Sequence, residues 1–309
     1  MLNHSCAKAL GMDAVANAYS SRGDSDGASG SARTRARIVV MAHNEERRIA
    51  ACLTSLPLAH AGIETHVIVN GSSDRTARIA AGFDAVRVHD YKEGGKARSW
   101  NRFVLDEAGP ADAFIFVDGD AEVVPGSIDA LLDALASNPR ANAVSALPCN
   151  GRGVAIYRQA VLDQNGLFGD LYALRGSFID RMRESGLRLP DDVIGDDSLI
   201  GALVKTDLQD ESHWRDERVL PCVEAGFLCE PTQVRPSSLL AQYRRLVNYS
   251  VRSYQNRIIS EIMRGPGPSA LPRHLSELYP KWLPRFAKRA HPLWWWVDRE
   301  ALKRMAAQG

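Results

Sequence analysis

The chain carries the run Phe114-Ile115-Phe116-Val117-Asp118-Gly119-Asp120. Four apolar residues in a row predict a buried strand, and two carboxylates follow where that strand leaves the core. A carboxylate at such a position must be hydrated, paired or bound to a cation, because an unpaired buried charge is too costly. Two acids at alternate positions suit Mg²⁺ or Mn²⁺, hard cations that prefer oxygen ligands. An isolated Asp-x-Asp also fits a solvated turn, so the surrounding motifs decide between the two interpretations.

Length and composition indicate a globular protein of one large domain or two modest ones. The 309 residues are 45% hydrophobic, enough for a full core. No apolar run approaches the roughly 18 residues of a membrane span, and the N-terminus lacks the apolar core of a signal peptide. The five cysteines are odd in number, scattered and without zinc spacing, so we expect reduced thiols in a cytoplasmic protein.

The charge is distributed unevenly along the chain. The formal net charge is +1, yet the segment from Pro231 to the end has 14 Lys and Arg against 4 Asp and Glu, a balance of +10. Residues 1–230 therefore carry −9. The acidic groups lie with the candidate metal ligands and the basic groups follow them. A basic segment is typical of a solvated face, and it also fits phosphate, anionic lipid or nucleic acid.

Alternating apolar and polar segments predict the fold class. Residues 1–34 are rich in Ser, Gly and Ala and predict a disordered segment. Strands are expected at 38–42, 66–69, 85–88, 114–118 and 141–147. Helices are expected after His43-Asn44-Glu45-Glu46, from an N-cap at Ser73 to Gly82, from Lys96, and from Ser127. The alternation favours an α/β fold with a mostly parallel sheet covered by helices, whose ligands bind at the carboxyl ends of the strands.

Four motifs at these strand and helix ends resemble those of family 2 glycosyltransferases. Met41-Ala42-His43-Asn44-Glu45-Glu46 resembles the family's opening P-A-Y-N-E-E. The stretch from Asn70 to Thr76, N-G-S-S-D-R-T, is similar to its D-G-S-x-D-x-T. Gly95-Lys96-Ala97 is similar to its G-K-A helix start, and Asp118-Gly119-Asp120 stands where the family has Asp-x-Asp. The resemblance continues through Asp196-Asp197 and through Gln242-Tyr243-Arg244-Arg245, which is similar to Q-x-x-R, and covers roughly residues 36 to 250.

The resemblance implies a GT-A fold, Rossmann-like, and an inverting transfer of a hexose from a nucleotide diphosphate sugar to an acceptor hydroxyl. It implies a catalytic domain at 35–235, with a nucleotide-sugar half at about 35–125 and an acceptor half at about 126–235. A basic, Trp-containing helical segment follows at 236–309. The acceptor is left open as a glycan, a lipid-linked molecule or a small molecule, and no nucleic acid is expected.

The same resemblance supplies the expected donor site and its metal, Mg²⁺ or Mn²⁺. Asp120 and Asp118 are the implied metal ligands, with Asp118 also meeting the ribose. A divalent ion and cations near the leaving pyrophosphate would stabilise its growing charge. Lys96 is a phosphate or base contact, or a solvated lysine at a helix start. The full set of expected nucleotide-sugar contacts is Ala42, Asn44, Glu45, Asn70, Lys96, Asp118, Gln242 and Arg245.

The sequence also departs from the family pattern. Val69-Asn70 stands where the family often has two acids before its G-S. An amide both donates and accepts hydrogen bonds, so Asn70 can pair with a nucleobase, and uracil is our expectation. His43 replaces the usual Tyr and is expected to pack within its loop. Leu246 replaces the family's Trp, and no membrane helices like those of processive synthases are found. We therefore expect a non-processive enzyme that adds one sugar.

The catalytic base is expected in the acidic loop between Leu189 and Asp197, where Asp191, Asp192, Asp196 and Asp197 are the candidates. A solvated acidic turn is the alternative for all four. Gly195 and a following helix would hold Asp196-Asp197 at a helix N-terminus, which stabilises charged acids. The resemblance assigns the base to the second acid of the pair. Asp197 is thus the expected base, Asp196 its support, and Asp192 the next candidate.

Two later segments are open to two interpretations each. Residues 151–177 either recognise the acceptor or form a helix pair that covers the sheet. A helix is expected from about Ser237 to Arg257, with Gln242 and Arg245 one turn apart on one face; Arg245 either holds the diphosphate or is a surface arginine. The C-terminal tryptophans among basic residues fit a peripheral contact at the inner face of a membrane, or they pack back on the domain.

Two other function classes remain. A phosphatase of the haloacid dehalogenase type could use Asp118-Gly119-Asp120, but its motif follows the first strand, whereas three strands precede this one. A catalytically silent nucleotide-sugar-binding module would keep the fold, but Asp120 and Asp197 together argue against silence. The products discriminate among the three: a transferase releases nucleoside diphosphate, a phosphatase inorganic phosphate, and a silent module neither.

Overall fold

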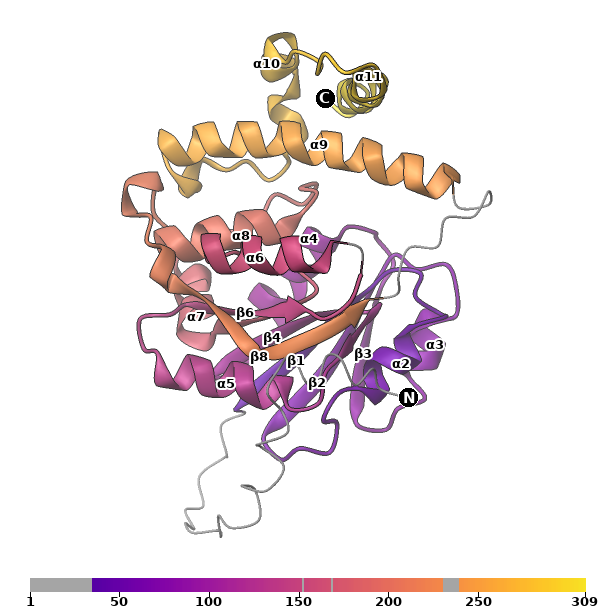
Figure 1. Cartoon of the computed structure of the whole chain (residues 1–309), viewed down its shortest axis with the longest axis vertical. Helices are drawn as coiled ribbons and strands as arrows, with labels where there is room; N and C mark the ends of the chain where they lie inside the picture. Colours follow the sequence, from indigo (N-terminus) through magenta and orange to yellow (C-terminus); the bar gives the residue numbers. More distant parts are fainter. Residues whose placement is uncertain (1–34, 152, 168, 230–238) are drawn as a thin grey trace.

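An eight-stranded sheet runs through the middle of the part of the chain described by the computed structural model, residues 35–151, 153–167, 169–229 and 239–309 (Figure 1). The strand order is β3-β2-β1-β4-β7-β6-β8-β5. The strands are β1 Ala36–Ala42, β2 Ile63–Asn70, β3 Val86–Tyr91, β4 Ala113–Asp118, β5 Ala121–Val123, β6 Ala143–Pro148, β7 Leu171–Arg175 and β8 Val219–Cys229.

Helices connect and cover the strands. The α-helices are α2 Ile49–Thr54, α3 Thr76–Ala80, α4 Lys96–Trp100, α5 Ser127–Ser137, α6 Val154–Gln164, α7 Gly176–Ser185, α8 Asp196–Thr206, α9 Leu239–Arg264, α10 Tyr279–Trp282 and α11 Pro292–Ala306. The π-helix η2 Asn101–Glu107 continues α4, and the short 3₁₀ helices are η3 Glu211–His213, η4 Asp216–Arg218, η6 Pro268–Ala270, η7 Leu275–Leu278 and η8 Leu283–Arg285.

The first half of the sheet is parallel. β1 lies between β2 and β4 and is parallel to both, and β3 pairs in parallel with β2. All seven residues of β1 are buried, as expected for a central strand covered on both faces. Consequently the polar loops that follow β1, β2 and β4 emerge at one edge of the sheet.

Alternation along β4 divides the interior into two cores. Phe114 and Phe116 belong to the core under α4, α7, α8 and α9, while Ile115 and Val117 belong to the core on the α5 side. Successive side chains of a strand point to opposite faces, so the apolar run before Asp118 anchors both layers. This double anchoring fixes the strand end that carries the acids.

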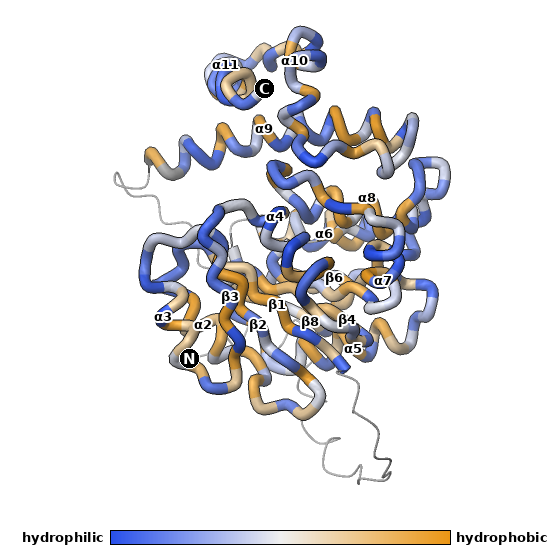
Figure 2. Tube along the Cα trace, turned by 180° about the vertical axis from the view of Figure 1, so that it is seen from behind, coloured by the Kyte–Doolittle hydropathy of each residue, from blue (hydrophilic) through white to orange (hydrophobic). Residues whose placement is uncertain are grey.

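The C-terminal helices form an outer layer. α9 crosses the molecule beyond α8, and α10 and α11 lie on its far side (Figure 1). Seen from behind and coloured by hydropathy, the strands are mostly hydrophobic whereas α9 alternates between hydrophobic and hydrophilic residues (Figure 2). Within the described residues, none of the helices has the length and apolar character that a membrane span requires.

The sequence identified the parallel half of the sheet but not its second half. Each expected strand is present with shifted ends, and the helices at Ile49, Lys96 and Ser127 are present. Three strands were missed: β5, β7 and β8. β7 runs antiparallel between β4 and β6, so residues 151–177 contain one helix and a strand of the sheet, not a helix pair.

Other expectations need correction or lie outside the described residues. The helix predicted from Ser73 begins at Thr76, because the Asp74 carboxylate accepts the Thr76 N–H at 3.0 Å and Arg75 occupies the N-cap. Among the described residues, Cys52, Cys222 and Cys229 carry free thiols. The predictions for residues 1–34, including Cys6, fall outside the described part of the chain.

Candidate functional site

Asp118-Gly119-Asp120, at the end of β4, lies against the end of β1. The backbone N–H of Gly119 donates to the Met41 carbonyl at 2.8 Å. A Cβ at position 119 would lie 2.9 Å from the Ala42 Cβ, so a glycine permits this close approach. Ala42, an expected donor contact, therefore packs against the glycine between the two acids.

A third carboxylate joins the pair. Asp118, Asp120 and Asp170 each offer an oxygen within 4.8 Å of the other two. Asp170 directly precedes β7, and its carbonyl accepts the Asp118 backbone N–H at 3.0 Å. Three hard oxygen donors at this spacing fit Mg²⁺ or Mn²⁺. The donor set thus suits the cation that the sequence led us to expect.

Burial makes this cluster electrostatically strained. Burial raises the pKa of Asp118 and of Asp170, and neighbouring acids add to the effect. Lys96 opposes the shift at Asp118, since its Nζ lies 2.6 Å from Asp118 Oδ1. Burial alone would lower the pKa of Lys96, but Asp118 and Asp196 hold it well above its usual value. A divalent cation among the three acids would relieve the remaining repulsion.

Lys96 also connects this cluster to the second acid pair. Its Nζ lies 3.8 Å from Asp196 Oδ1. Asp196 is buried and is the first residue of α8. The expected metal ligands and the expected base pair therefore face each other across one ammonium group at the start of α4.

The loop after β1 is joined to the turn after β2 by hydrogen bonds. Asn44, at a positive φ of 57°, donates from its backbone N–H to Ser72 Oγ at 2.9 Å. Its side-chain oxygen accepts the Ser73 N–H at 2.9 Å. The Glu45 N–H donates to Thr76 Oγ1 at 2.8 Å. These contacts hold the two loops side by side at the carboxyl edge of the sheet.

Asn70 braces the same region. Its amide donates to the Ala42 carbonyl at 3.1 Å and its side-chain oxygen accepts the Gly95 N–H at 3.4 Å. The His43 ring donates from Nδ1 to the Asn70 carbonyl at 2.7 Å, in agreement with the packing role expected for it. The buried Asn70 side chain thus fixes the position of the glycine that begins the Lys96 helix.

Arg48 is a charged residue of this edge that the sequence did not single out. It lies 2.8 Å from the Glu45 carboxylate and 3.4 Å from Asp120 Oδ2. Burial and the nearby Asp120 raise the pKa of Glu45. Arg48 therefore neutralises two acids beside the candidate cation site.

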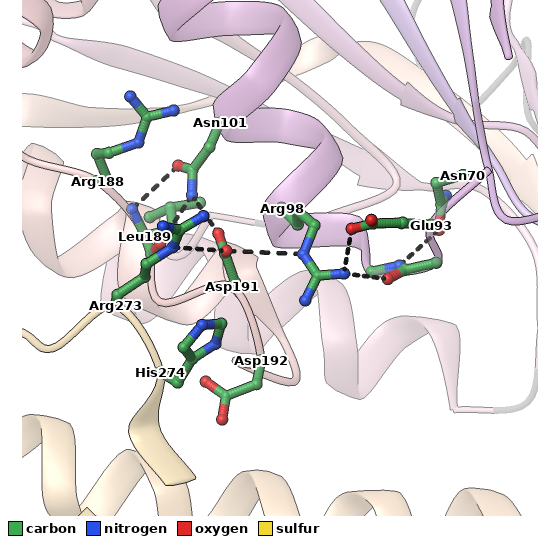
Figure 3. A network of polar contacts seen from close by, with 12 residues as sticks. Asn70, Glu93, Arg98, Asn101, Arg188, Leu189, Asp191, Asp192, Arg273 and His274 are labelled. Atoms are coloured by element: carbon green, nitrogen blue, oxygen red, sulfur yellow. Dashed lines mark hydrogen bonds and ion pairs between the residues drawn. The ribbon is translucent and has the colours of Figure 1, made fainter. Parts of the chain in front are cut away.

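The four acids of the 189–197 loop have different surroundings. Asp191 lies 3.6 Å from Arg98, 3.4 Å from Arg273 and 3.3 Å from the Asn101 amide (Figure 3). Asp192 accepts the backbone N–H groups of Leu275 and Ser276 at 2.7 and 2.9 Å. Both acids bind the segment that follows α9.

A cavity of about 1080 Å³ lies beside this network. Arg98, Arg188, Asp191 and Arg273 are among the residues that line it, and the cluster of Asp118, Asp120 and Asp170 is not. Its arginines are paired with acids, Arg188 with Asp106 at 2.6 and 2.8 Å. The cavity is thus adjacent to the expected donor site and separate from the acid cluster.

Asp197 forms an ion pair with Arg252, which lies on α9. The Arg252 guanidinium lies 3.0 Å from Asp197 Oδ1. Gln242 and Arg245 lie one turn apart on the same helix, which is present as expected and extends to Arg264. Arg245 is exposed, and Gln242 is partly buried.

Asp170, Arg48 and Arg252 are the site residues that sequence reasoning missed. Asp170 had a readable signal, because Gly169-Asp170 borders the apolar run Leu171-Tyr172-Ala173-Leu174 just as Asp118 borders its own. Arg252 had none, since its partner lies 55 positions away in the sequence.

The C-terminal tryptophans divide into two groups. Trp282 and Trp294 pack against the core, and the Arg289 guanidinium lies 4.0 Å from the Trp294 ring centroid. Trp295 and Trp296 are 38% and 59% exposed. Packing on the domain therefore accounts for the first group but not for the second.

A search of curated proteins returned no match. Glucosyl-3-phosphoglycerate synthase from Mycobacterium tuberculosis, solved with Mg²⁺ and UDP, is 20% identical, with 71% of this chain and 79% of that chain covered and a TM-score of 0.50. The mannosyltransferase PcManGT from Pyrobaculum calidifontis, solved with GDP-Man and Mn²⁺, is 19% identical, with 90% and 74% covered and a TM-score of 0.49.

The expected fold class is confirmed: a mostly parallel sheet flanked by helices, GT-A-like, with C-terminal helices. Residues 37–193, just over half of the chain, match the model of the family described as Glycosyl transferase family 2. The matched range contains Lys96, the three clustered acids and the acids Asp191 and Asp192. The chain is a glycosyltransferase and belongs to glycosyl transferase family 2.

Proposed function

We propose that this enzyme transfers one hexose from a nucleotide diphosphate sugar to an acceptor hydroxyl, with inversion and with the help of Mg²⁺ or Mn²⁺. The observation that carries the proposal is Lys96, whose ammonium group lies between the three-acid cluster and Asp196. One half of the site would hold the donor diphosphate and the other would activate the acceptor.

The charged side chains of the site support the assignment of the donor side. Asp118, Asp120 and Asp170 would hold the cation, which when bound supplies positive charge to the leaving diphosphate. Lys96 adds a cation that stays protonated, because the acids around it hold its pKa well above the usual value. Gln242 and Arg245, which share a face of α9, are proposed to reach the diphosphate from the opposite side, where the planar guanidinium suits phosphate oxygens.

Asn70 is the residue that suggests which nucleobase the donor carries. The two solved structures hold UDP in one case and GDP-Man in the other, so the fold does not select a base. The Asn70 amide is buried and bonds Ala42 and Gly95, so a nucleobase edge would pair with its second N–H and with the second lone pair of its oxygen. Uracil is our proposal on this ground.

On the acceptor side, Asp197 is the proposed catalytic base. As the acceptor oxygen attacks the anomeric carbon, the bond from that carbon to the diphosphate oxygen breaks and the hydroxyl proton passes to the Asp197 carboxylate. Asp191 and Asp192 bind the chain after α9, which favours Asp197 over them. Asp196 would hold Lys96 and orient the site. Attack on the face opposite the leaving group gives inversion.

We also propose that the C-terminal segment contacts a membrane surface. The exposed Trp295 and Trp296 are followed by Arg299, whose guanidinium lies 5.9 and 5.2 Å from their ring centroids. Tryptophan with basic residues is the composition of an interfacial anchor. A lipid-linked acceptor would suit this placement, with a soluble glycan or small molecule as the other possibilities.

Two substitutions test the division of labour. Asp120→Ala should abolish Mn²⁺-dependent binding of UDP, measured by calorimetry. Asp197→Asn, nearly isosteric but unable to take a proton, should keep UDP binding near the wild-type value and lower the transfer rate by roughly 10²- to 10⁴-fold, the usual contribution of general base catalysis. Wild-type turnover in Asp197→Asn, or an equal loss of UDP affinity, would move the base elsewhere, with Asp192 the next candidate.

A further inference from the structure

Arg252 reaches from α9 across to the first turn of α8. Its Nη2 lies 3.0 Å from Asp197 Oδ1, and the same nitrogen donates a hydrogen bond to Ser198 Oγ. The Arg252 side chain is 30% exposed and the Asp197 side chain 20%. The pair is therefore partly withdrawn from water, where charge-assisted contacts are stronger than on an open surface.

Gly195 makes this reach possible. A Cβ at position 195 would lie 2.3 Å from Arg252 Nε and 2.5 Å from its Cζ. The residue also has a φ of +81°, a left-handed conformation that favours glycine. The glycine that turns the chain into α8 is thus also the residue that leaves room for the guanidinium.

Gln255 fixes the neighbouring turn of α9 to the same loop. Its side-chain oxygen accepts the Ile194 N–H at 2.8 Å, and its amide donates to the Asp192 carbonyl at 2.9 Å and to the Tyr279 hydroxyl at 2.8 Å. Gln255 is buried. These hydrogen bonds fix the backbone of α9 near Arg252 relative to the 192–195 loop. The position from which the Arg252 side chain extends is therefore fixed as well.

The two oxygens of Asp197 face different neighbours. Oδ1 is bound by Arg252, while Oδ2 would lie 3.4 Å from a Cβ built on Gly169. Gly169 precedes Asp170, a member of the three-acid cluster. Arg252 thus holds Oδ1, while the Asp197 side chain packs beside the glycine that precedes Asp170.

We propose that Arg252 is the positioning residue of the catalytic base, and that Gly195 is a glycine in order to admit it. The inference rests on the proposed function, in which Asp197 takes the acceptor proton. Displacement of a reacting group by about 1 Å can cost roughly 10²-fold in rate. Loss of the guanidinium should therefore lower turnover while the donor site is unchanged.

The first test compares Arg252→Ala, Arg252→Lys and Arg257→Ala. Arg257 is the matched control on the same helix, because its guanidinium lies 4.8 Å from the Phe286 ring centroid, away from Asp197. With UDP-glucose and Mn²⁺, Arg252→Ala should release UDP roughly 10- to 100-fold more slowly than wild type, with UDP affinity within about twofold. Lysine should restore part of the rate, and Arg257→Ala should match wild type.

The second test uses Gly195→Ala in a double-mutant cycle. A methyl group there should push the guanidinium away, so the variant should reproduce the Arg252→Ala defect, and the two changes together should be no worse than one, because they remove the same contact. Thermal unfolding of each variant separates this result from a loss of fold. A crystal structure of Arg252→Ala should show the Asp197 carboxylate in a new orientation.

The outcomes separate the inference from the function on which it rests. An unmoved Asp197 carboxylate in the Arg252→Ala crystal, or turnover equal to wild type in that variant, overturns the positioning role. Parallel losses of UDP affinity and rate would assign Arg252 to donor binding instead, and this too overturns it. Full activity of Asp197→Asn would remove the proposed base itself, whatever Arg252 does.

Discussion

At the scale of single residues, Lys96 holds its charge in a partly buried position between two acids. Its ammonium group contacts Asp118 at 2.6 Å and Asp196 at 3.8 Å, and burial would favour its neutral form without them. A charged lysine held between two acids is a fixed cation, because its position and protonation are set before any ligand binds. Preorganised charge of this kind is the largest common source of transition-state stabilisation.

Asp170 tests the three-acid cluster. Because it shares the cluster with Asp118 and Asp120, Asp170→Asn should weaken the Mn²⁺ dependence of UDP binding by at least about tenfold. Asp129→Asn is the control, since Asp129 is a half-exposed carboxylate on α5. Calorimetric titration of UDP with and without Mn²⁺ measures the effect. Equal Mn²⁺ dependence in Asp170→Asn and in the control would remove Asp170 from the set.

Residue roles were readable from the sequence only where they depend on local pattern. Asp118 follows its own apolar run, and Asp196-Asp197 follows a glycine at a helix start, so a short window contains the signal. Asp170 borders an apolar run in the same way and so had a local signal that we missed. Arg252 gains its role from a contact between distant segments, which no short window contains.

Among the structural elements, the loop before α8 is held from two sides. Asp192 accepts the Leu275 and Ser276 N–H groups at the start of η7, and Gln255 of α9 binds the Ile194 N–H. These contacts tie the segments after the sheet to the loop that carries the proposed base. The C-terminal helices are thus part of the frame of the site.

Asp192→Ala should act on stability and not on chemistry. Losing a side chain that caps backbone N–H groups costs about 1 kcal/mol, so the free energy of unfolding measured with urea should fall by about that amount. The transfer rate should stay near the wild-type value, in contrast to Asp197→Asn. A collapse of turnover in Asp192→Ala with unchanged stability would contradict this assignment and favour Asp192 as base.

The paired strands β1, β2 and β3 carry a buried polar chain that makes stability depend on pH. Arg37 Nη1 donates to His66 Nε2 at 3.1 Å, and His66 Nδ1 lies 3.1 Å from His89 Nε2. Burial, with His89 next in effect, lowers the pKa of His66 from 6.5 to about 4. Between pH 4 and pH 6.5, His66 is therefore mostly protonated in the unfolded chain and mostly neutral in the native protein. Stability from the neutral ring is complete above pH 6.5 and is lost as pH falls toward 4.

Urea unfolding at about pH 7.5 and about pH 4.5 measures this effect. Between the two conditions the wild type should lose about 2 kcal/mol more than His66→Gln, which has no titrating ring at that position. Comparing losses within each protein cancels the carboxylates that titrate in both. The same loss in both proteins would show that His66 does not titrate in this way.

Elements with a strong local pattern were predictable, whereas pairing over long distances was not. β1 and β4 contain the continuous apolar runs 38–42 and 113–117, and α5 presents Ile128, Leu131, Leu132 and Leu135 to the core at helical spacing. β7 is only five residues long and owes its place to partners at 113–117 and 143–145. Its antiparallel insertion is a property of the assembled sheet.

For the molecule as a whole, exposed apolar side chains gather on the outer layer. Leu240, Tyr243 and Tyr249 of α9 and Leu293, Trp295 and Trp296 of α11 are all exposed, and Figure 1 shows both helices at one end of the molecule. The basic balance of this segment gives the layer a positive charge. Apolar and cationic groups together suit an anionic lipid surface.

Co-sedimentation with vesicles tests the membrane contact. The wild type should bind phosphatidylglycerol vesicles at low salt and bind phosphatidylcholine vesicles weakly. The double variant Trp295→Ser, Trp296→Ser should bind at least about tenfold more weakly. Trp214→Ser is the matched control, because Trp214 is 39% exposed and lies after η3, outside the C-terminal helices. No wild-type binding, or equal binding by the double variant, would exclude this anchor.

The most direct measurement of the central claim is product analysis of the purified chain with UDP-glucose, other nucleotide sugars and Mn²⁺. The proposed function predicts release of a nucleoside diphosphate that stops on chelation and is absent from Asp120→Ala. Release of inorganic phosphate would point to a phosphatase. A nucleoside diphosphate released equally with chelator, or no product from any nucleotide sugar despite binding, would contradict a metal-dependent sugar transfer.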